Sequence, residues 1–493
     1  MSSYDIIIIG AGLSGINSAY RLEETLPDHS FIVLEARDSV GGTWSFWRYP
    51  GARCDSSMAV FGFPWRPWPY DSNMVDAQKI RDYIDESASL HGLDKLVRLG
   101  HRVTSASWSA EEQRWTLTVR VSSPGGPSTQ EFKSKWIINC SGYYDYDKPR
   151  EASIPGLDRF KGQVVHPQFW KDETDYAKEK IVIIGSGATA VTLFPVLAKT
   201  AASVTILQRS PSYVMSMPSK NSFIRFLQLF LPVWLAATLN WWYNMIEETL
   251  FVAVSTAYPR LGRKIVKSEM VKQLPPGFDI DKHFTPRYNL FDQRLCFCPD
   301  NDFFQALHQP HCNIVTDTIE TVTETGIRTT SGLELEADMI VTATGLYMNL
   351  MSSIPLTVDG EPVVLGRVYA WNGMMLEGVP NAGTVVGYTT STWTPGADVR
   401  MRSLIKVIKH TERLGATSAV PYIDPEERKR LPRKPVLTNS STYIVDAIKR
   451  LPMVADVGPW RYGRSWFEDM RVLLFGDLVK GLRFTAAGKS KAA

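Results

Sequence analysis

The chain has 493 residues, of which 44% are hydrophobic and 21% charged, so it can bury several cores and is not a disordered or low-complexity protein. At ~150 residues per domain, this length predicts about three domains. The 54 basic and 51 acidic residues leave a net charge of only +3, which disfavours a dedicated nucleic-acid-binding protein. The few, irregularly spaced cysteines predict reduced thiols, with no disulfide framework and no metal site: Cys54, Cys140, Cys296, Cys298 and Cys312.

The N-terminal residues follow a pattern of strand, glycine turn, helix and strand. A strand of four isoleucines at residues 6–9 runs into a turn in which Gly10 permits the tight bend. Gly12 lets the backbone approach a pyrophosphate, and Gly15 lets the following helix pack close to the strand. The next strand, residues 31–34, ends at Glu35, whose carboxylate would accept hydrogen bonds from a ribose. This unit predicts a dinucleotide site that suits FAD.

A second unit of the same type begins with a strand at residues 181–184. Its turn reads Gly185-Ser186-Gly187-Ala188-Thr189-Ala190, and a helix to about residue 198 and a strand at residues 204–207 follow. Where the first unit has an acid, this one has Arg209, a forked cation that would bind a 2′-phosphate. The second site therefore suits NADPH, with the alternative that Arg209 is only a solvated charge at a strand end.

Two dinucleotide units on one chain indicate an oxidoreductase in which NADPH reduces a flavin. The reduced flavin could pass electrons to a disulfide, but that route needs a cysteine pair such as Cys-x-x-Cys, and the spacing of Cys296 and Cys298 does not supply one. Reaction with O₂ is the remaining interpretation. Further apolar strands at residues 136–139 and 339–342 each end near a glycine, and residues 102–121 predict hairpin strands in the first unit.

Residues 160–170, FKGQVVHPQFW, resemble the fingerprint Phe-x-Gly-x₃-His-x₃-Trp of the Baeyer–Villiger monooxygenases. The fingerprint stands just before the second glycine turn, as in that family, although Lys171 departs from the usual Pro or Asp. The resemblance extends through residues 41–44, 48–51, 140–144 and 292–296. The subgroup that the chain resembles most is the ethionamide-activating monooxygenases, which have a similar pattern at residues 283–286 and 387–389; the last ~40 residues match poorly.

The resemblance implies roles for individual residues. Arg294 matches the essential arginine that keeps a peroxide at flavin C4a ionised, and Asp55 matches the acid that orients it beside the cofactor. The run Gly42, Thr43 and Trp44 matches residues that lie along the flavin or nicotinamide. His166 matches a residue that couples the domains rather than an acid–base catalyst, and Trp170 is expected to pack in a core. Trp393 is a candidate wall of the substrate cavity, with a core aromatic as the equal alternative.

The expected fold is α/β, with two Rossmann-like dinucleotide-binding domains and a helical insertion. We expect an FAD domain at residues 1–148 and 350–493, an NADPH domain at 149–214 and 291–349, and the insert at 215–290. The expected activity is an FAD-dependent, NADPH- and O₂-consuming Baeyer–Villiger oxidation of an apolar ketone to an ester or lactone. The alternative is a flavin-containing monooxygenase that oxygenates sulfur or nitrogen, as in a thioether, or hydroxylates its substrate.

The N-terminus and one uncharged segment bear on where in the cell the protein is expected to lie. No basic leader precedes the first strand, which predicts a cytoplasmic protein. From Phe226 to Ile246 the chain has no formal charge and is long enough to span a bilayer, but Pro232 and several polar residues interrupt it. We expect a buried helical insert here. The alternative is a peripheral membrane contact, which the aromatic residues Trp234, Trp241, Trp242 and Tyr243 would suit.

Overall fold

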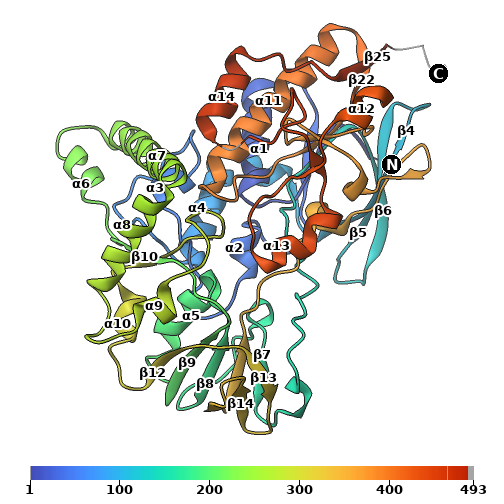
Figure 1. Ribbon diagram of the computed structural model, residues 1–493. Helices are drawn as coiled ribbons and strands as arrows, with labels where there is room; N and C mark the ends of the chain where they lie inside the picture. Colours follow the sequence, from blue (N-terminus) through green and yellow to red (C-terminus); the bar gives the residue numbers. More distant parts are fainter. Residues whose placement is uncertain (1, 464, 487–493) are drawn as a thin grey trace.

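The computed structural model describes residues 2–463 and 465–486. Two sheets organise the chain (Figure 1): one in the upper part of the view, formed by the N-terminal strands together with strands after residue 350, and one at the bottom, formed by strands from the middle of the chain. The chain crosses between them at residues 140–162 and 343–355.

The first sheet has eleven strands among the described residues, and β1 lies between β2 and β6, both parallel to it. Its side chains alternate between two cores: Ile6 and Ile8 pack in one, Ile7 and Ile9 in the other. This two-sided burial explains why the strand is continuously apolar. The strands are β1 Ser2–Ile9, β2 Phe31–Leu34, β3 Val97–Arg98, β4 His101–Ser109, β5 Arg114–Val121, β6 Ser128–Asn139, β17 Leu356–Val358, β18 Glu361–Pro362, β19 Ala370–Trp371, β20 Met375–Leu376 and β21 Ala382–Thr384.

The second sheet is wholly parallel, in the order β12-β9-β8-β16-β7, and it repeats the two-sided burial. Ile181 and Ile183 pack in one core, while Val182 and Ile184 pack in another. A small antiparallel sheet, β13 Ile319–Val322, β14 Gly326–Thr329 and β15 Glu334–Glu336, lies beside it. The strands of the parallel sheet are β7 Gln163–Val165, β8 Lys180–Ile184, β9 Ser203–Gln208, β12 Cys312–Thr316 and β16 Met339–Thr342.

Helices cover both sheets. α1 packs against the long α11 and joins the same core as β1, whereas α5 packs on the second sheet. The helices outside the insert are α1 Leu13–Thr25, α2 Thr43–Phe46, α3 Met58–Phe61, α4 Ala77–Leu90, α5 Ala188–Leu197, α10 Asp302–Ala306, α11 Trp393–Arg413, α12 Pro425–Arg430, α13 Thr442–Ala447 and α14 Trp466–Phe475. The predicted α/β class with two Rossmann-like units is confirmed, and the predicted strands and helices of both glycine-turn units are present.

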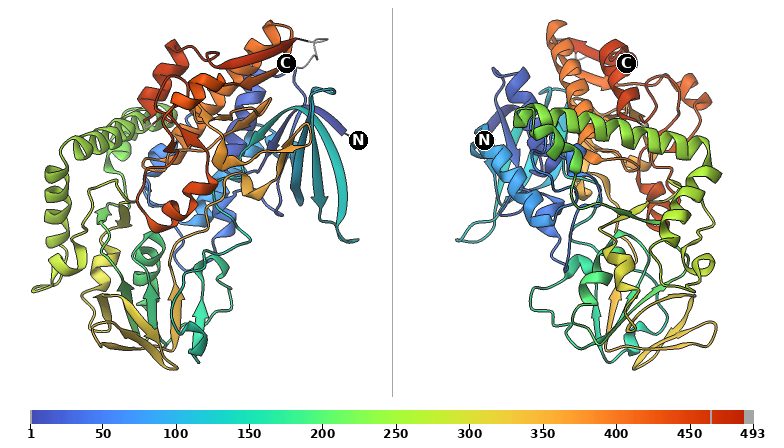
Figure 2. Two further views of the ribbon diagram at one scale, coloured as in Figure 1. Left: turned by 45° about the vertical axis from the view of Figure 1, so that its right-hand side comes forward. Right: turned by 90° about the vertical axis from the view of Figure 1, so that its left-hand side faces the viewer.

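The insert is helical, as predicted, but the prediction that it is buried is wrong. Pro232 divides the uncharged segment into α6 Ser222–Gln228 and α7 Val233–Ala257, and α8 Pro259–Val271 and α9 Ile280–Phe284 follow. α7 and α8 form an outer edge of the molecule (Figure 2), and the side chain of Trp234 is 70% exposed. Among the described residues, no helix combines the length and apolar character needed to cross a bilayer.

Candidate active site

A cavity of about 1450 Å³ lies between the two sheets and is lined by residues from both. It is larger than the ~300–1,000 Å³ clefts that hold one drug-sized ligand. The loops after β1, β2 and β6 face it from one side, and the loops after β8, β9 and β16 from the other. The predicted site residues that line it are Gly10, Gly12, Glu35, Gly42, Thr43, Trp44, Asp55, Gly185, Gly187, Ala188, Thr189, Arg209 and Arg294.

The first glycine turn brings a helix N-terminus to the cavity. Gly10 has a φ of +101°, and a Cβ there would lie 2.9 Å from the carbonyl oxygen of Cys140. A Cβ on Gly15 would lie 1.9 Å from the Gly10 oxygen, so this predicted residue packs α1 on β1 and is absent from the cavity lining. α1 begins after Gly12, and no described side chain caps it. Its first N–H groups therefore remain available to an anion.

Glu35 directly follows β2 and lines the cavity next to the first glycine turn. One carboxylate oxygen accepts a hydrogen bond from the backbone N–H of Ala11 at 2.7 Å, and the other from that of Arg37 at 3.0 Å. Each oxygen keeps a lone pair for a further donor, such as a ribose hydroxyl. Arg37 donates to the Gly42 carbonyl at 2.6 Å and lies over the ring of Tyr146, 4.4 Å from its centroid. Its planar cation is thus held at the cavity edge, which the sequence analysis did not anticipate.

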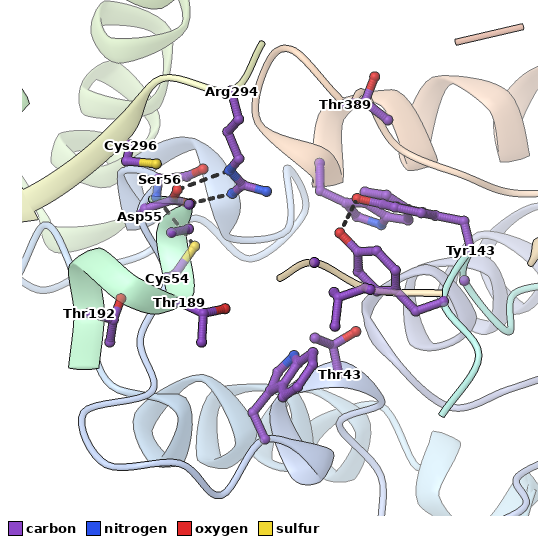
Figure 3. A pocket seen from close by; sticks show the side chains of 18 of the residues that line it. Thr43, Cys54, Asp55, Ser56, Tyr143, Thr189, Thr192, Arg294, Cys296 and Thr389 are labelled. Carbon is purple, nitrogen blue, oxygen red and sulfur yellow. Dashed lines mark hydrogen bonds and ion pairs between the residues drawn. The ribbon is translucent and has the colours of Figure 1, made fainter. Parts of the chain in front are cut away.

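Thr43 and Trp44 begin the short helix α2, directly after Gly42. The Thr43 hydroxyl lies 2.8 Å from that of Tyr146, and the Trp44 ring meets Phe61 edge-on at 5.6 Å. Both residues line the cavity, and Figure 3 shows Thr43 there. Trp44 therefore packs against the core and also faces the cavity.

The second glycine turn brings the N-terminus of α5 to the cavity, as the first turn does for α1. A Cβ on Gly185 would lie 2.3 Å from the carbonyl oxygen of Ala343. Only a glycine therefore allows the ends of β8 and β16 to lie this close together. At Gly187, by contrast, nothing lies within 4 Å of the Cβ position, and no described side chain caps the helix that begins there. Arg209 donates a hydrogen bond to the Thr442 hydroxyl at 3.0 Å and forms no ion pair with another described residue. Its charge is free for a phosphate.

Arg294 and Asp55 meet in the lining of the cavity, although 239 positions separate them in the sequence. The Arg294 Nε donates to Asp55 Oδ2 at 3.1 Å, and one terminal nitrogen, Nη2, donates to Oδ1 (Figure 3). The other terminal nitrogen, Nη1, makes no hydrogen bond within the described chain, and the Arg294 side chain is 44% exposed. The Asp55 carboxylate raises the pKa of Arg294 well above its usual value, so a permanent positive charge faces the cavity.

The groups around this ion pair are held neutral. Burial raises the pKa of Tyr49, Cys54 and Cys296 to about 12, and it raises the pKa of Tyr143 further still. These phenols and thiols therefore stay protonated near neutral pH. No second anion competes with Asp55 for Arg294 among these groups.

Three aromatic or imidazole residues from the sequence analysis have distinct places. Trp393 lines the cavity, stacks on Tyr143 with centroids 5.1 Å apart and donates from Nε1 to the Ser14 hydroxyl. His166 also lines the cavity; its Nδ1 accepts from the Gln168 backbone at 3.2 Å, and burial lowers its pKa. Trp170 is buried in the core of the second unit.

The structure adds cavity residues to which the sequence analysis gave no role. Tyr143 belongs to a quoted motif, and its aromatic character next to a strand-end glycine was the available signal. Glu248 on α7 accepts hydrogen bonds from the backbone and hydroxyl of Thr392, at 2.6 and 2.7 Å. No local pattern indicates Glu248, because its role depends on where the insert lies.

Proteins of similar sequence carry the names of FAD-containing or FAD-binding monooxygenases. The chain is 39% identical over 485 residues to the FAD-containing monooxygenase EthA of Mycobacterium tuberculosis, covering 97% of each protein. It is 40% identical to EthA of Mycolicibacterium smegmatis, with 98% and 97% covered, and 36% identical to the probable FAD-binding monooxygenase AlmA of Acinetobacter baylyi, with 95% and 93% covered. The predicted resemblance to this subgroup is confirmed.

Solved structures share the fold. Cyclohexanone monooxygenase from Rhodococcus sp. Phi1 bound to NADP⁺ superposes with a TM-score of 0.75 at 18% identity, covering 99% of this chain and all of the other. A steroid monooxygenase bound to NADP gives a TM-score of 0.74 at 19% identity, with 98% and 100% covered. The model of the family described as "Flavin-binding monooxygenase-like" matches residues 3–453. The chain is therefore a flavoprotein monooxygenase that belongs to the flavin-binding monooxygenase-like family.

Proposed function

We propose that the chain catalyses a Baeyer–Villiger oxidation, with FAD in the first dinucleotide unit and NADPH in the second. The carrying observation is the Arg294–Asp55 pair, which puts a fixed positive charge in the cavity between the two units. We further propose the domain limits 1–148 and 350–493 for FAD, 149–214 and 291–349 for NADPH, and 215–290 for the insert.

The residues present fit both dinucleotides. Two helices, α1 and α5, direct uncapped N-termini at the cavity, and each begins after a glycine. Nothing lies within 4 Å of the Cβ position of Gly187, whereas that of Gly12 lies 3.3 Å from the Cα of Gly42. Glu35 would hold the ribose of FAD, whereas Arg209 would hold the 2′-phosphate of NADPH. When bound, the flavin supplies the redox chemistry that NADPH reduction and O₂ activation require.

The Arg294–Asp55 ion pair would stabilise the negative charge that develops during the reaction. During oxygen transfer to a carbonyl, negative charge develops on oxygen, and the free Nη1 of Arg294 is the donor that would stabilise it. Asp55 holds the guanidinium through two hydrogen bonds, so little reorganisation is needed when this charge forms. Tyr143 and Trp393 stack as one wall of the site and would help to exclude water.

The overall reaction balances with one O₂ for each ketone. NADPH and a proton provide two electrons; one oxygen atom enters a carbon–carbon bond next to the carbonyl, and the other leaves as water. The cavity lining includes Phe251, Phe291, Leu295 and Phe297, which favours an apolar ketone over a charged one.

The test is the mass of the product formed by the purified enzyme from NADPH, ¹⁸O₂ and a panel of linear ketones, aryl ketones and thioethers. An ester that carries a single ¹⁸O supports the proposal. Sulfoxide without ester would instead assign the enzyme to the alternative, oxygenation of sulfur or nitrogen. Hydroxylated ketone without ester would likewise overturn the proposal.

A further inference from the structure

The insert carries many exposed apolar residues on successive helices, which together we call the insert face. From Leu239 to Val254 on α7, exposed apolar residues recur at steps of three or four, so these lie along one side of the helix. The face extends onto α6 and onto the start of α8. It consists of Phe226, Leu229, Phe230, Val233, Trp234, Leu239, Trp242, Ile246, Leu250, Val254, Tyr258, Leu261 and Ile265, each at least 40% exposed.

The face continues onto a helix from the far end of the sequence. Trp242 meets Trp466 with ring centroids 5.4 Å apart, and Trp466 meets Phe467 at 5.1 Å. Phe467 and Phe475 on α14 are 41% and 83% exposed. Scattered exposed apolar residues are ordinary, but a contiguous patch of large aromatic and aliphatic side chains marks an interaction surface.

Two unpaired cations of α8 adjoin the insert face. Arg260 and Lys264 are exposed beside Leu261 and Ile265, and neither forms an ion pair with another described residue. Of the acids of α7, Glu247 is exposed and Glu248 is half-buried, and both line the cavity. At α8 the insert face therefore has a basic border.

We propose that the insert face docks on the surface of an anionic phospholipid bilayer. Tryptophan, phenylalanine and leucine on one face, flanked by cations, are the composition of helices that lie in the plane of a membrane interface. The charge distribution favours this occupant over a second copy of the chain, because pairing through the same face would bring its cations together. Docking does not depend on the reaction, since it needs no turnover.

The test is flotation of the FAD-loaded enzyme with vesicles of phosphatidylglycerol and phosphatidylcholine, compared with vesicles of phosphatidylcholine alone. We expect the protein to float with the anionic vesicles and to lose most of this binding in 1 M salt. The double variant Phe230→Ser with Trp234→Ser should lower the partition coefficient at least tenfold. Arg260→Glu with Lys264→Glu should lower it by at least fivefold for each positive charge removed.

The control is a variant at two exposed positions outside the insert face, in the C-terminal part of the chain. Leu414→Ser with Lys429→Glu removes one exposed apolar side chain and reverses one exposed cation there, and it should float like the wild type. Flavin absorbance and melting temperature verify that each variant is folded. Absence of flotation by the wild type, or equal flotation of all variants, would overturn the proposal. Self-association that the serine variant abolishes, without flotation, would assign the face to a second copy instead.

Discussion

Arg294 combines a fixed position with a free donor, because Asp55 occupies two of its nitrogens and leaves the third toward the cavity. We predict that Arg294→Ala lowers the rate of ester formation by about 10²–10³-fold, the effect typical of removing one electrostatic stabiliser. Arg294→Lys should retain more activity, since it keeps the charge but loses the bidentate contact. Steady-state kinetics with a ketone substrate measure both.

The control for this prediction is cofactor retention. Flavin absorbance should be unchanged in both variants, because Arg294 is not part of either glycine turn. Since the pKa of Arg294 is raised, its charge persists as the pH rises from 6 to 10, and its deprotonation should produce no loss of activity over this range. Equal ester formation by Arg294→Ala and the wild type would contradict the electrostatic role.

Arg209 has no carboxylate partner among the described residues, and its hydrogen bond to Thr442 is one that a phosphate could replace. We predict that Arg209→Gln weakens NADPH binding by roughly 10- to 150-fold, which corresponds to one charge-assisted hydrogen bond. Affinity for NADH, which lacks the 2′-phosphate, should change little. Titration with both nucleotides measures this, and an equal loss for both would contradict the assignment.

At the scale of elements, the Cβ position of Gly15 in the first unit is blocked by the backbone, whereas that of Gly187 in the second unit is open. We predict that Gly15→Ala lowers the melting temperature, because its Cβ would lie 1.9 Å from the Gly10 oxygen and force β1 and α1 apart. Gly187→Ala should leave the melting temperature unchanged without nucleotide, since its Cβ meets nothing within 4 Å. It should nevertheless raise the KM for NADPH, because the methyl group stands where the phosphates approach α5.

These two variants control for each other. Thermal denaturation and NADPH kinetics on both separate helix–strand packing from nucleotide approach. A destabilised Gly187→Ala, or a Gly15→Ala variant with unchanged stability, would show that the local packing differs from that described.

At the scale of the whole molecule, the cavity exists only because distant segments meet. Glu248 on α7 joins the N-terminus of α11, two segments separated by 144 positions, through both hydrogen bonds to Thr392. Burial raises the pKa of Glu248 above its ordinary value of 4.5. The folded state therefore holds the proton more tightly than the unfolded state, and ionisation costs stability as the pH rises above about 4.5.

We predict that Glu248→Gln removes this cost. The amide keeps an oxygen for the Thr392 N–H and a donor for its hydroxyl, so the apparent melting temperature should match the wild type below pH 4.5 and exceed it increasingly as the pH rises. Thermal denaturation between pH 4 and 8 measures the difference. Glu111→Gln, at an exposed glutamate, should show no such trend. Parallel melting curves for Glu248→Gln and the wild type would contradict the prediction.

The sequence by itself determined the two dinucleotide units, because their requirements are local. A glycine turn, the apolar strand before it and the charged residue after the next strand stand within about 30 residues, so Gly10, Glu35, Gly187 and Arg209 could be predicted as binding residues from spacing alone. The family resemblance then pointed to Arg294 and Asp55. It could not place them, since a contact across 239 positions depends on how the two sheets pack.

Only the tertiary structure decided the rest. It brought Glu248 to Thr392, set Arg37 at the cavity edge and turned one side of α7 to the cavity and the other outward. The apolar composition of the insert predicted burial, and this was wrong, because hydrophobicity measures a preference for leaving water but not what is present to cover the surface. α7 lies on the outside of both sheets, and within the described chain little packs over its outer face.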